Sequence, residues 1–391
     1  MGKRIGLEVS LAVAEAVKLA KVDVVSAYPI TPQTHIVEEL SIYVANGDLD
    51  AEFIPVESEH SAMSAALGAS AAGARVYTAT ASQGLALMHE ILFIVSGMRM
   101  PVVMTVANRA LSAPISIWND HGDIMAERDI GWLQIFSENG QEALDLTLCA
   151  FKIAEDKRVL LPMIVNLDGF TLSHVIEPVI IPDHAEVDAF LPPYKPVLKL
   201  DTDKPVTLGP VGVPEMYTEA RKQIEQAVLA AKPVVKEVLD GFGKAFDRRY
   251  KLVEQNGKVG AKTLFVTMGS LGETCMTAVD EMLAEGADVG QTRIRLWRPF
   301  PEEEFLAACA GAQRLVVIDR ALSPGAVCAP VASELKSLFY GRAGAPEIVS
   351  VIAGLGGRDV TVRDFKEMYQ QAVSGKLSGN SLMWGVESHA S

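Results

Sequence analysis

Short apolar segments alternate with longer segments of helical pattern through the first 190 residues of the chain. The short segments are rich in Val, Ile and Ala and are bounded by turn residues, which is typical of buried strands. We predict strands at residues 22–27, 53–56, 75–79, 101–107 and 160–167, and helices at residues 7–20, 59–73, 84–96 and 142–155. Strands that alternate with helices indicate an α/β fold, in which helices cover both faces of a parallel sheet.

The organisation of the chain changes after residue 190. Six prolines lie within residues 191–214, which predicts an extended connector. Residues 215–250 have a helical pattern, and Pro233 should kink this helix or break it into two. A second alternating unit follows, with predicted strands at residues 262–268, 293–297, 314–318 and 348–353. We therefore predict a first α/β domain at 1–190, a connector and helical segment at 191–258, and a smaller α/β domain at 259–391.

Charge and hydropathy exclude several classes of protein. The 391 residues carry a formal net charge of −14, and nucleic-acid phosphates require a basic surface, so we expect no nucleic-acid partner. No uncharged stretch reaches the roughly 20 residues needed to cross a bilayer. Glu8 and Glu15 interrupt any signal-like segment near the N-terminus. We expect a cytoplasmic protein without a membrane span.

The cysteines and histidines show no metal-ligand spacing. No Cys-x-x-Cys pair is present, which argues against a zinc or iron–sulfur site within this chain. We expect buried thiols in a reducing cytoplasm at the four cysteines, Cys149, Cys275, Cys309 and Cys328. We also predict no metal site at the separated histidines, which include His60, His89, His121 and His174.

Polar side chains follow the predicted strands at their carboxyl ends, where open parallel sheets bind ligands. These segments are Tyr28 to Thr31, Glu57 to His60, Ser82 to Gly84, Asn108 to Arg109, and Asp168 to Gly169. An arginine at such an edge can hold a planar carboxylate or phosphate with two parallel hydrogen bonds. Structural interpretations are also open, because a glutamate at a helix start stabilises the helix dipole and an isolated arginine forms surface ion pairs.

Two glycine-rich segments follow predicted strands in the second unit. Gly269 to Gly272 opens a helix and could cap an anion, and Gly354 to Gly357 lacks the lysine of a phosphate-binding loop. Neither segment has the Gly-x-Gly-x-x-Gly pattern of a dinucleotide site, so we interpret both as turns.

The segment from Ala27 to Thr34, Ala-Tyr-Pro-Ile-Thr-Pro-Gln-Thr, resembles the α subunit of the thiamine-diphosphate-dependent 2-oxoacid:ferredoxin oxidoreductases. This family includes the pyruvate:ferredoxin oxidoreductases. The resemblance covers nearly the whole chain and continues at residues 56–62, 79–85, 108–110, 117–123, 167–170, 298–301 and 354–357. It implies two α/β domains with parallel sheets, a pyrimidine-side domain and a domain similar to the C-terminal domain of transketolase.

The resemblance also implies catalytic roles for three residues. Glu59 resembles the glutamate that contacts N1′ of the cofactor's aminopyrimidine, where a shared proton favours the imino tautomer that removes the C2 proton. Thr31 resembles the threonine whose hydroxyl bonds the substrate, and Arg109 resembles the arginine that binds its carboxylate. Further cofactor contacts are implied at Tyr28, Pro29, Ile30, Ser82, Gln83 and Gly84, and further substrate contacts at Asn119, Asp120 and His121.

One expected motif is missing from the chain. Thiamine enzymes hold the diphosphate through Mg²⁺ at a Gly-Asp-Gly segment, and the chain contains no such segment. The resemblance therefore implies that thiamine diphosphate is shared with a β subunit that carries the diphosphate and Mg²⁺ site. It further implies γ and ferredoxin-like δ subunits with [4Fe-4S] clusters, with ferredoxin or another electron acceptor as an external partner.

The reaction implied is the oxidative decarboxylation of a 2-oxoacid with coenzyme A, giving acyl-CoA, CO₂ and reduced ferredoxin. We favour pyruvate as the substrate. Aryl and branched-chain 2-oxoacids such as phenylglyoxylate and 2-oxoisovalerate remain open, because a partner subunit can supply part of the pocket. A non-catalytic nucleotide-binding or electron-transfer subunit is the rival hypothesis, and the absence of a dinucleotide fingerprint counts against it.

Overall fold

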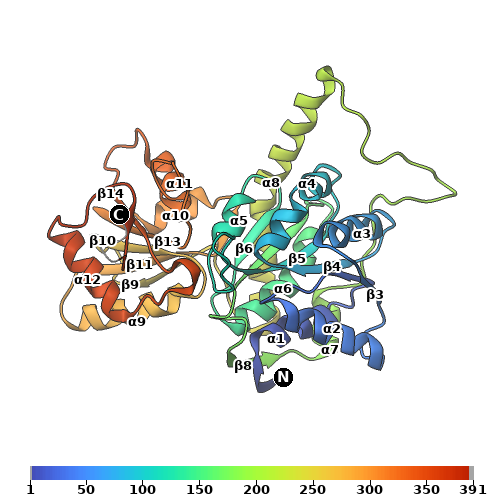
Figure 1. Ribbon diagram of the computed structural model, residues 1–391, viewed down its shortest axis with the longest axis horizontal. Helices are drawn as coiled ribbons and strands as arrows, with labels where there is room; N and C mark the ends of the chain where they lie inside the picture. The colour runs from blue at the N-terminus through green and yellow to red at the C-terminus, as the bar shows by residue number, and fades with distance from the viewer. Residues whose placement is uncertain (1, 387–391) are drawn as a thin grey trace.

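Two parallel-rich sheets form the centres of two α/β units in the computed structural model, which describes residues 2–386 (Figure 1). The larger sheet has the strand order β12-β6-β7-β5-β4-β2-β3. Every neighbouring pair in it is parallel except β12, which runs antiparallel to β6. Its strands are β2 (Val24–Ala27), β3 (Glu52–Pro55), β4 (Val76–Thr80), β5 (Val103–Asn108), β6 (Leu133–Phe136), β7 (Met163–Asp168) and β12 (Leu296–Arg298).

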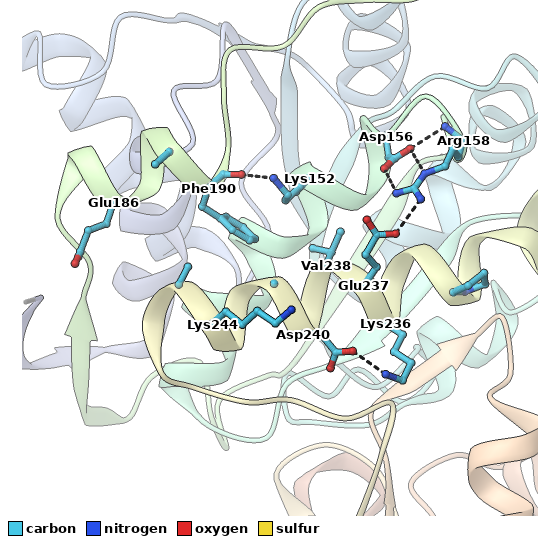
Figure 2. A pocket seen from close by; sticks show the side chains of 14 residues that line it. Lys152, Asp156, Arg158, Glu186, Phe190, Lys236, Glu237, Val238, Asp240 and Lys244 are labelled. Carbon is cyan, nitrogen blue, oxygen red and sulfur yellow. Dashed lines mark hydrogen bonds and ion pairs between the residues drawn. The ribbon is translucent and has the colours of Figure 1, made fainter.

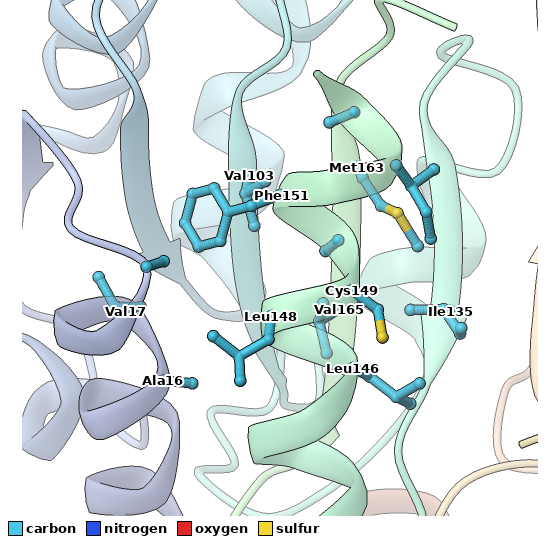
Figure 3. Packing of buried hydrophobic residues seen from close by; sticks show 14 of the residues in the cluster. Ala16, Val17, Val103, Ile135, Leu146, Leu148, Cys149, Phe151, Met163 and Val165 are labelled. Atoms are coloured by element: carbon cyan, nitrogen blue, oxygen red, sulfur yellow. The ribbon is translucent and has the colours of Figure 1, made fainter. Parts of the chain in front are cut away.

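Helices cover both faces of the larger sheet, which confirms the predicted α/β class. One hydrophobic cluster joins α1 (Val9–Leu19), α2 (Thr34–Asn46) and α6 (Gly140–Ala154) to the sheet. A second cluster lies on the other face with α3 (Glu59–Ala71) and α4 (Ser82–Gly97). Figure 3 shows α6 between α1 and the strands, with Leu148 and Phe151 of α6 among the packed side chains. The nearly continuous apolar run of α6 follows from this position, since α1, α8 and the sheet surround it.

In the first unit, two strands that lie outside its large sheet were not predicted. β1 (Lys3–Glu8) pairs antiparallel with β8 (Ile176–Ile181), and this pair forms a separate small sheet. The short helices α5 (Gly122–Ala126) and α7 (His184–Phe190) complete the first unit. Within the described residues, no helix is both long and apolar enough to cross a membrane. The four cysteines are buried and free, as predicted.

The connector at residues 191–213 contains no helix or strand, and α8 (Pro214–Phe246) follows it. The start of α8 projects away from the body together with the connector (Figure 1). Of the two outcomes predicted at Pro233, the break is wrong, because α8 continues through this residue, and the kink stays a prediction. The loss of one backbone hydrogen bond is tolerated where Val235, Leu239 and Phe242 bury the following turns against the first unit.

The smaller sheet has the order β15-β14-β13-β10-β11-β9. Its strands are β9 (Val253–Gly257), β10 (Thr263–Thr267), β11 (Val289–Ile294), β13 (Arg314–Asp319), β14 (Glu347–Ile352) and β15 (Leu382–Met383). Its helices are α9 (Leu271–Ala284), α10 (Glu302–Ala308), α11 (Pro330–Phe339) and α12 (Val362–Val373), with a 3₁₀ turn, η1, at Leu355–Gly357.

The single strand predicted at residues 293–297 is wrong. The segment divides at Arg295, so that β11 belongs to the smaller sheet and β12 pairs with β6 in the larger one. A residue beyond 259 therefore contributes to the first unit's sheet, and the predicted boundaries at 190 and 258 stay predictions. The alternation of side chains along one segment cannot reveal such a crossing, because β11 is buried throughout and β12 nearly so.

A buried ion-pair network joins the two units beside this crossing. Glu142 of α6 accepts hydrogen bonds from Arg293 and Arg295 at 2.6 to 2.9 Å. Burial alone would raise the pKa of Glu142, but the two guanidinium groups outweigh it and lower the pKa to about 2. Loss of this carboxylate would leave two buried cations without their shared partner, so the network fixes the two units relative to each other.

Candidate active site

The polar segments predicted from the strand ends meet at the carboxyl edge of the larger sheet. Arg109, directly after β5, donates from Nη1 to the Thr31 carbonyl oxygen beyond β2 at 2.8 Å. Gly169, after β7, donates its N–H to the carbonyl oxygen of Asn108 at 3.0 Å. Gly84, near the start of α4, lies against the Glu59 side chain at the start of α3. Parallel strands thus gather the predicted segments from five separate regions of the chain.

The Arg109 guanidinium is oriented before any ligand binds. Only 6% of the residue is exposed, and Nε donates to the Ser116 carbonyl oxygen at 3.0 Å in addition to the Nη1 bond. No hydrogen bond of Nη2 is found within residues 2–386. Burial lowers the pKa of Arg109, while nearby Asp123 opposes the shift, and an arginine remains charged at neutral pH. The free edge of the guanidinium suits a carboxylate.

Glu59 offers a buried carboxylate at the same edge. It begins α3, where the Ser58 side chain caps the helix by accepting from Ser61 N–H. Glu59 is 7% exposed, and its carboxylate makes no hydrogen bond or ion pair with the residues that the structure describes. By contrast, Glu57 is exposed and accepts a hydrogen bond from the Ser61 hydroxyl, which lowers its pKa. A buried acceptor without a protein partner is a place for a ligand donor.

Gly84 allows the Glu59 side chain to pack directly against the start of α4. A Cβ atom at position 84 would stand 2.6 Å from Glu59 Oε1 and 2.5 Å from Thr80 Oγ1. Thr80 Oγ1 is itself buried without a hydrogen-bond partner in the described chain. An aminopyrimidine ring carries the donors and acceptors that such groups require, so these residues fit the predicted cofactor.

Ser82 holds an unusual backbone conformation at the start of α4. Its φ of 47° lies in the left-handed region, which a residue with a side chain adopts only at a cost. Its N–H donates to Asp123 Oδ2 at 3.0 Å, and its hydroxyl donates to the Ala110 carbonyl oxygen at 2.6 Å. Gln83 Oε1 lies 2.6 Å from the same hydroxyl oxygen and is an alternative acceptor for its single proton. Ser82 therefore joins the β4 and β5 ends of the site.

Asp123 is the site residue that sequence reasoning missed. Its Oδ2 accepts from the N–H groups of Ser82 and Arg109, each at 3.0 Å, and its Oδ1 accepts from Asn108 Nδ2 at 3.1 Å. Burial raises the pKa of Asp123 to about 6 against these hydrogen bonds. The residue closes the segment 117–123, so the resemblance pointed to it, but no role was assigned.

The turn after β2 lies at the surface of this edge. Tyr28, Pro29 and Thr31 are exposed, and Ile30 is half-buried. The Tyr28 carbonyl oxygen accepts from Gln33 Nε2 at 2.8 Å, which fixes the turn from within the protein. The Thr31 side chain is accessible next to the carbonyl oxygen that Arg109 binds.

The structure places Asn119, Asp120 and His121 at the boundary with the second unit, where they contact η1 and the β13 end. The Asn119 carbonyl oxygen accepts from Gly357 N–H at 2.7 Å, and Asp120 Oδ2 accepts from Gly356 N–H at 3.3 Å. His121 Nε2 lies 2.7 Å from Asp168 Oδ1. Their predicted contact with substrate stays a prediction, and these bonds support a positioning role.

The Gly269 to Gly272 segment, which we interpreted as a turn, binds the carboxylate of Asp168 through Ser270. Asp168 Oδ2 accepts from Ser270 N–H at 2.9 Å and from the Ser270 hydroxyl at 2.5 Å. Arg320 Nη1 lies 3.0 Å from the same oxygen. Burial would raise the pKa of Asp168, but His121 and Arg320 hold it well below its usual range. This cluster connects the site edge of the first unit to α9 of the second.

A groove of about 690 Å³ elsewhere on the first unit is not part of this edge (Figure 2). It lies between α6, α7 and α8, and its charged side chains pair with one another, including Arg158 with Asp156 and Lys236 with Asp240. No residue of the strand-end segments lines it. A cavity of about 240 Å³ between the units is lined by residues that include Ser270, Arg320 and Gly357.

Comparisons with known proteins agree with this arrangement. Residues 15–240 match the family model for pyruvate flavodoxin/ferredoxin oxidoreductase, thiamine diphosphate-binding, and residues 261–365 match core domain II of pyruvate:ferredoxin oxidoreductase. Pyruvate synthase subunit PorA of Methanocaldococcus jannaschii is 52% identical over 376 residues, covering 95% of each chain. Ketoisovalerate oxidoreductase subunit VorA of Pyrococcus horikoshii is 45% identical over 372 residues, covering 94% of each.

A solved structure shows the same fold at lower sequence identity. It is the 2-oxoglutarate:ferredoxin oxidoreductase from Magnetococcus marinus with 2-oxoglutarate, coenzyme A and succinyl-CoA bound. The TM-score is 0.69 at 19% identity, and the match covers 96% of the present chain and 66% of that chain.

Proposed function

Because this chain belongs to the pyruvate flavodoxin/ferredoxin oxidoreductase family, we propose that Glu59, Thr31 and Arg109 are its catalytic residues. The chain is the α subunit of a 2-oxoacid:ferredoxin oxidoreductase, and it supplies the pyrimidine side of a thiamine diphosphate site. The observation that carries the assignment of Glu59 is its buried carboxylate, which packs against Gly84 and has no hydrogen-bond partner in the described chain.

Thiamine diphosphate, when bound, supplies the carbon nucleophile and the electron sink for decarboxylation. Glu59 holds a proton at N1′ of the aminopyrimidine, a role that only a carboxyl group can fill at this position. The buried surroundings keep water from this carboxylate and strengthen its hydrogen bond to the ligand. Tyr28, Pro29, Ile30 and the segment Ser82–Gln83–Gly84 form the walls around the ring.

Arg109 binds and orients the carboxylate of the 2-oxoacid. Its two hydrogen bonds to the carbonyl oxygens of Thr31 and Ser116 fix the guanidinium plane. The side chain therefore loses little further conformational entropy when the substrate binds. The Thr31 hydroxyl is accessible beside it and donates to the substrate. Asp123 positions both Ser82 and Arg109 through their backbone N–H groups.

Pyruvate is the substrate we propose, converted with coenzyme A to acetyl-CoA and CO₂ while ferredoxin is reduced. The pyruvate synthase subunit is the more similar of the two curated relatives described above, and the ketoisovalerate subunit shares the same family. A kcat/KM for pyruvate well above those for 2-oxoisovalerate and phenylglyoxylate is expected from the assembled enzyme. A higher kcat/KM for either competitor would show that pyruvate is not the preferred substrate. The assignment of the catalytic residues would not change.

The remaining cofactors belong to partner chains in this proposal. The chain has no Gly-Asp-Gly segment for Mg²⁺ and diphosphate, and its four cysteines are buried and separate. We assign the diphosphate and Mg²⁺ to a β subunit and the [4Fe-4S] clusters to γ and δ subunits, with ferredoxin as acceptor.

A native pull-down of the chain tests the assembly. Mass spectrometry and metal analysis should find a subunit with a Gly-Asp-Gly segment, iron and thiamine diphosphate in the captured complex. The purified single chain should not retain thiamine diphosphate in calorimetry. Tight, stoichiometric binding of the cofactor by the single chain would contradict the shared site, and capture of a nicotinamide or flavin without thiamine diphosphate would favour the rival class.

A further inference from the structure

Two histidines and a glutamate meet on the first unit, at the turn that follows β7. Glu8 is the last residue of β1, His35 is the second residue of α2, and His174 lies in the turn between β7 and β8. One ligand atom from each residue lies within 4.8 Å of the other two. All three side chains are partly exposed, so a cation from solvent can reach them. No metal site was predicted at His174 from the sequence, because residues 8, 35 and 174 have no spacing along the chain that could reveal this cluster.

The local contacts already align the three groups. His35 Nδ1 lies 2.6 Å from Glu8 Oε1, and the rings of His35 and His174 have centroids 4.5 Å apart. Ligand atoms around a tetrahedral ion with bonds of about 2.1 Å stand about 3.4 Å apart, so small side-chain rotations suffice. Ser173 Oγ lies 2.7 Å from His174 Nδ1 and leaves Nε2 of that ring for another partner. A hydrogen bond to the second ring nitrogen is typical of a metal-ligating histidine.

We propose that Glu8, His35 and His174 bind a divalent transition-metal cation, with zinc as the representative ion. Two imidazoles and one carboxylate form a recurring ligand set for such ions, and water can complete the coordination. Burial lowers the pKa of His174, and the nearby His35 lowers it further, while Glu8 acts in the opposite direction.

The site would connect three segments around the catalytic edge. The His174 ring packs on Phe170 at 4.4 Å between centroids, and Phe170 packs on Trp118 at 4.9 Å. Phe170 N–H also donates to Ser173 Oγ at 2.9 Å. A bound cation would hold this turn against the start of α2, which follows the Thr31 segment. Its role is to position these loops, and the proposal does not depend on the identity of the substrate.

Isothermal titration calorimetry with ZnCl₂ measures zinc binding by the full-length chain. The chain carries no histidine tag and is first treated with a chelator. One zinc per chain is expected. His35→Ala and His174→Gln should each weaken binding by at least roughly 100-fold, and Ser173→Ala by about 10 to 100-fold. Zinc should raise the melting temperature of the unsubstituted chain and leave that of His35→Ala unchanged.

His89→Ala is the matched control. His89 Nδ1 also lies 2.6 Å from a glutamate, Glu127 Oε2, and the ring is half exposed, but this pair is not part of a three-ligand cluster among the described residues. Zinc binding should be unaffected in His89→Ala. The proposal is overturned if the unsubstituted chain binds no zinc, or if His35→Ala and His89→Ala bind it equally well. Because His35 is partly exposed, its replacement should leave the fold intact, and circular dichroism checks this.

Discussion

The Glu59 carboxylate lies against the α-carbon of Gly84, so closely that a Cβ atom at position 84 would stand 2.6 Å from Glu59 Oε1. The two residues begin different helices, α3 and α4, which follow different strands of one sheet. Glycine is therefore required here for the space it leaves and not for its backbone angle, since its φ is not positive. The Glu59 side chain fills that space, so Gly84 fixes the position from which Glu59 would contact N1′ in the proposed site.

Gly84→Ala should lower kcat by roughly 100-fold in the assembled enzyme, because the new methyl group displaces the Glu59 carboxylate. Gly97→Ala in the same helix is the control, since a Cβ there meets nothing within 4 Å. Steady-state kinetics and thermal melting on the same preparations separate catalysis from folding. Normal kcat in folded Gly84→Ala would show that catalysis does not depend on the position of Glu59 beside Gly84.

Arg109→Lys should lower kcat/KM for the 2-oxoacid by roughly 10 to 100-fold, which is about 1.4 to 2.7 kcal/mol. Lysine keeps the charge but lacks the rigid guanidinium plane. It therefore cannot donate to the Thr31 and Ser116 carbonyl oxygens and to a carboxylate at the same time. Cofactor content and subunit assembly should remain unchanged. A lower melting temperature with normal kinetics would instead identify Arg109 as a structural residue.

Asp123→Asn should lower the unfolding free energy by about 1 to 3 kcal/mol and also reduce kcat. Each carboxylate oxygen accepts from two donors, so an amide in either orientation leaves two of the four donors without a partner. Denaturant unfolding measures the first effect. Unchanged stability and activity would mean that these donors find other partners and that Asp123 does not position the site.

Asp319→Asn tests the pH dependence of the second unit. Asp319 caps α11 by accepting from the N–H groups of Val331 and Ala332, and burial raises its pKa to about 7. A carboxyl whose pKa is raised in the folded state binds protons more tightly there than in the unfolded chain. Its contribution to stability is therefore greatest below pH 4 and is lost as the pH rises through 7.

Between pH 5 and pH 8, the unsubstituted chain should thus lose about 1 to 3 kcal/mol more unfolding free energy than Asp319→Asn. Urea unfolding at the two pH values measures the difference. Parallel pH profiles for both chains would show that Asp319 is already ionised in the folded state at pH 5.

The sequence predicted the α/β class and the meeting of the strand-end segments, because buried parallel strands leave a strong local pattern. The strand at 160–167 illustrates this, since β7 occupies Met163–Asp168. The edge strand β1 alternates weakly and was missed, and the β11–β12 crossing depends on a contact with β6 that no local pattern records.

Candidate site residues could be proposed from the sequence where a local motif marks them. Contacts between residues that are far apart in the sequence could not be predicted. Glu59 and Arg109 each follow a strand end and could be proposed from the chain alone. Asp123 and the Asp168–Ser270 contact depend on how separate segments fold together, so their partners became visible only in the structure. The same holds for the Glu8, His35 and His174 cluster.

Exchange of the cofactor's C2 proton in Glu59→Gln enzyme is the most direct test of the proposed role of Glu59. Glutamine keeps the shape of the side chain but cannot share a proton at N1′, so exchange in deuterated buffer followed by NMR should slow by about 10² to 10⁴-fold. Assembly and cofactor content should be normal, as measured by size-exclusion chromatography and cofactor analysis. Near-normal exchange in the fully assembled variant would contradict the assignment of the N1′ carboxyl group to Glu59.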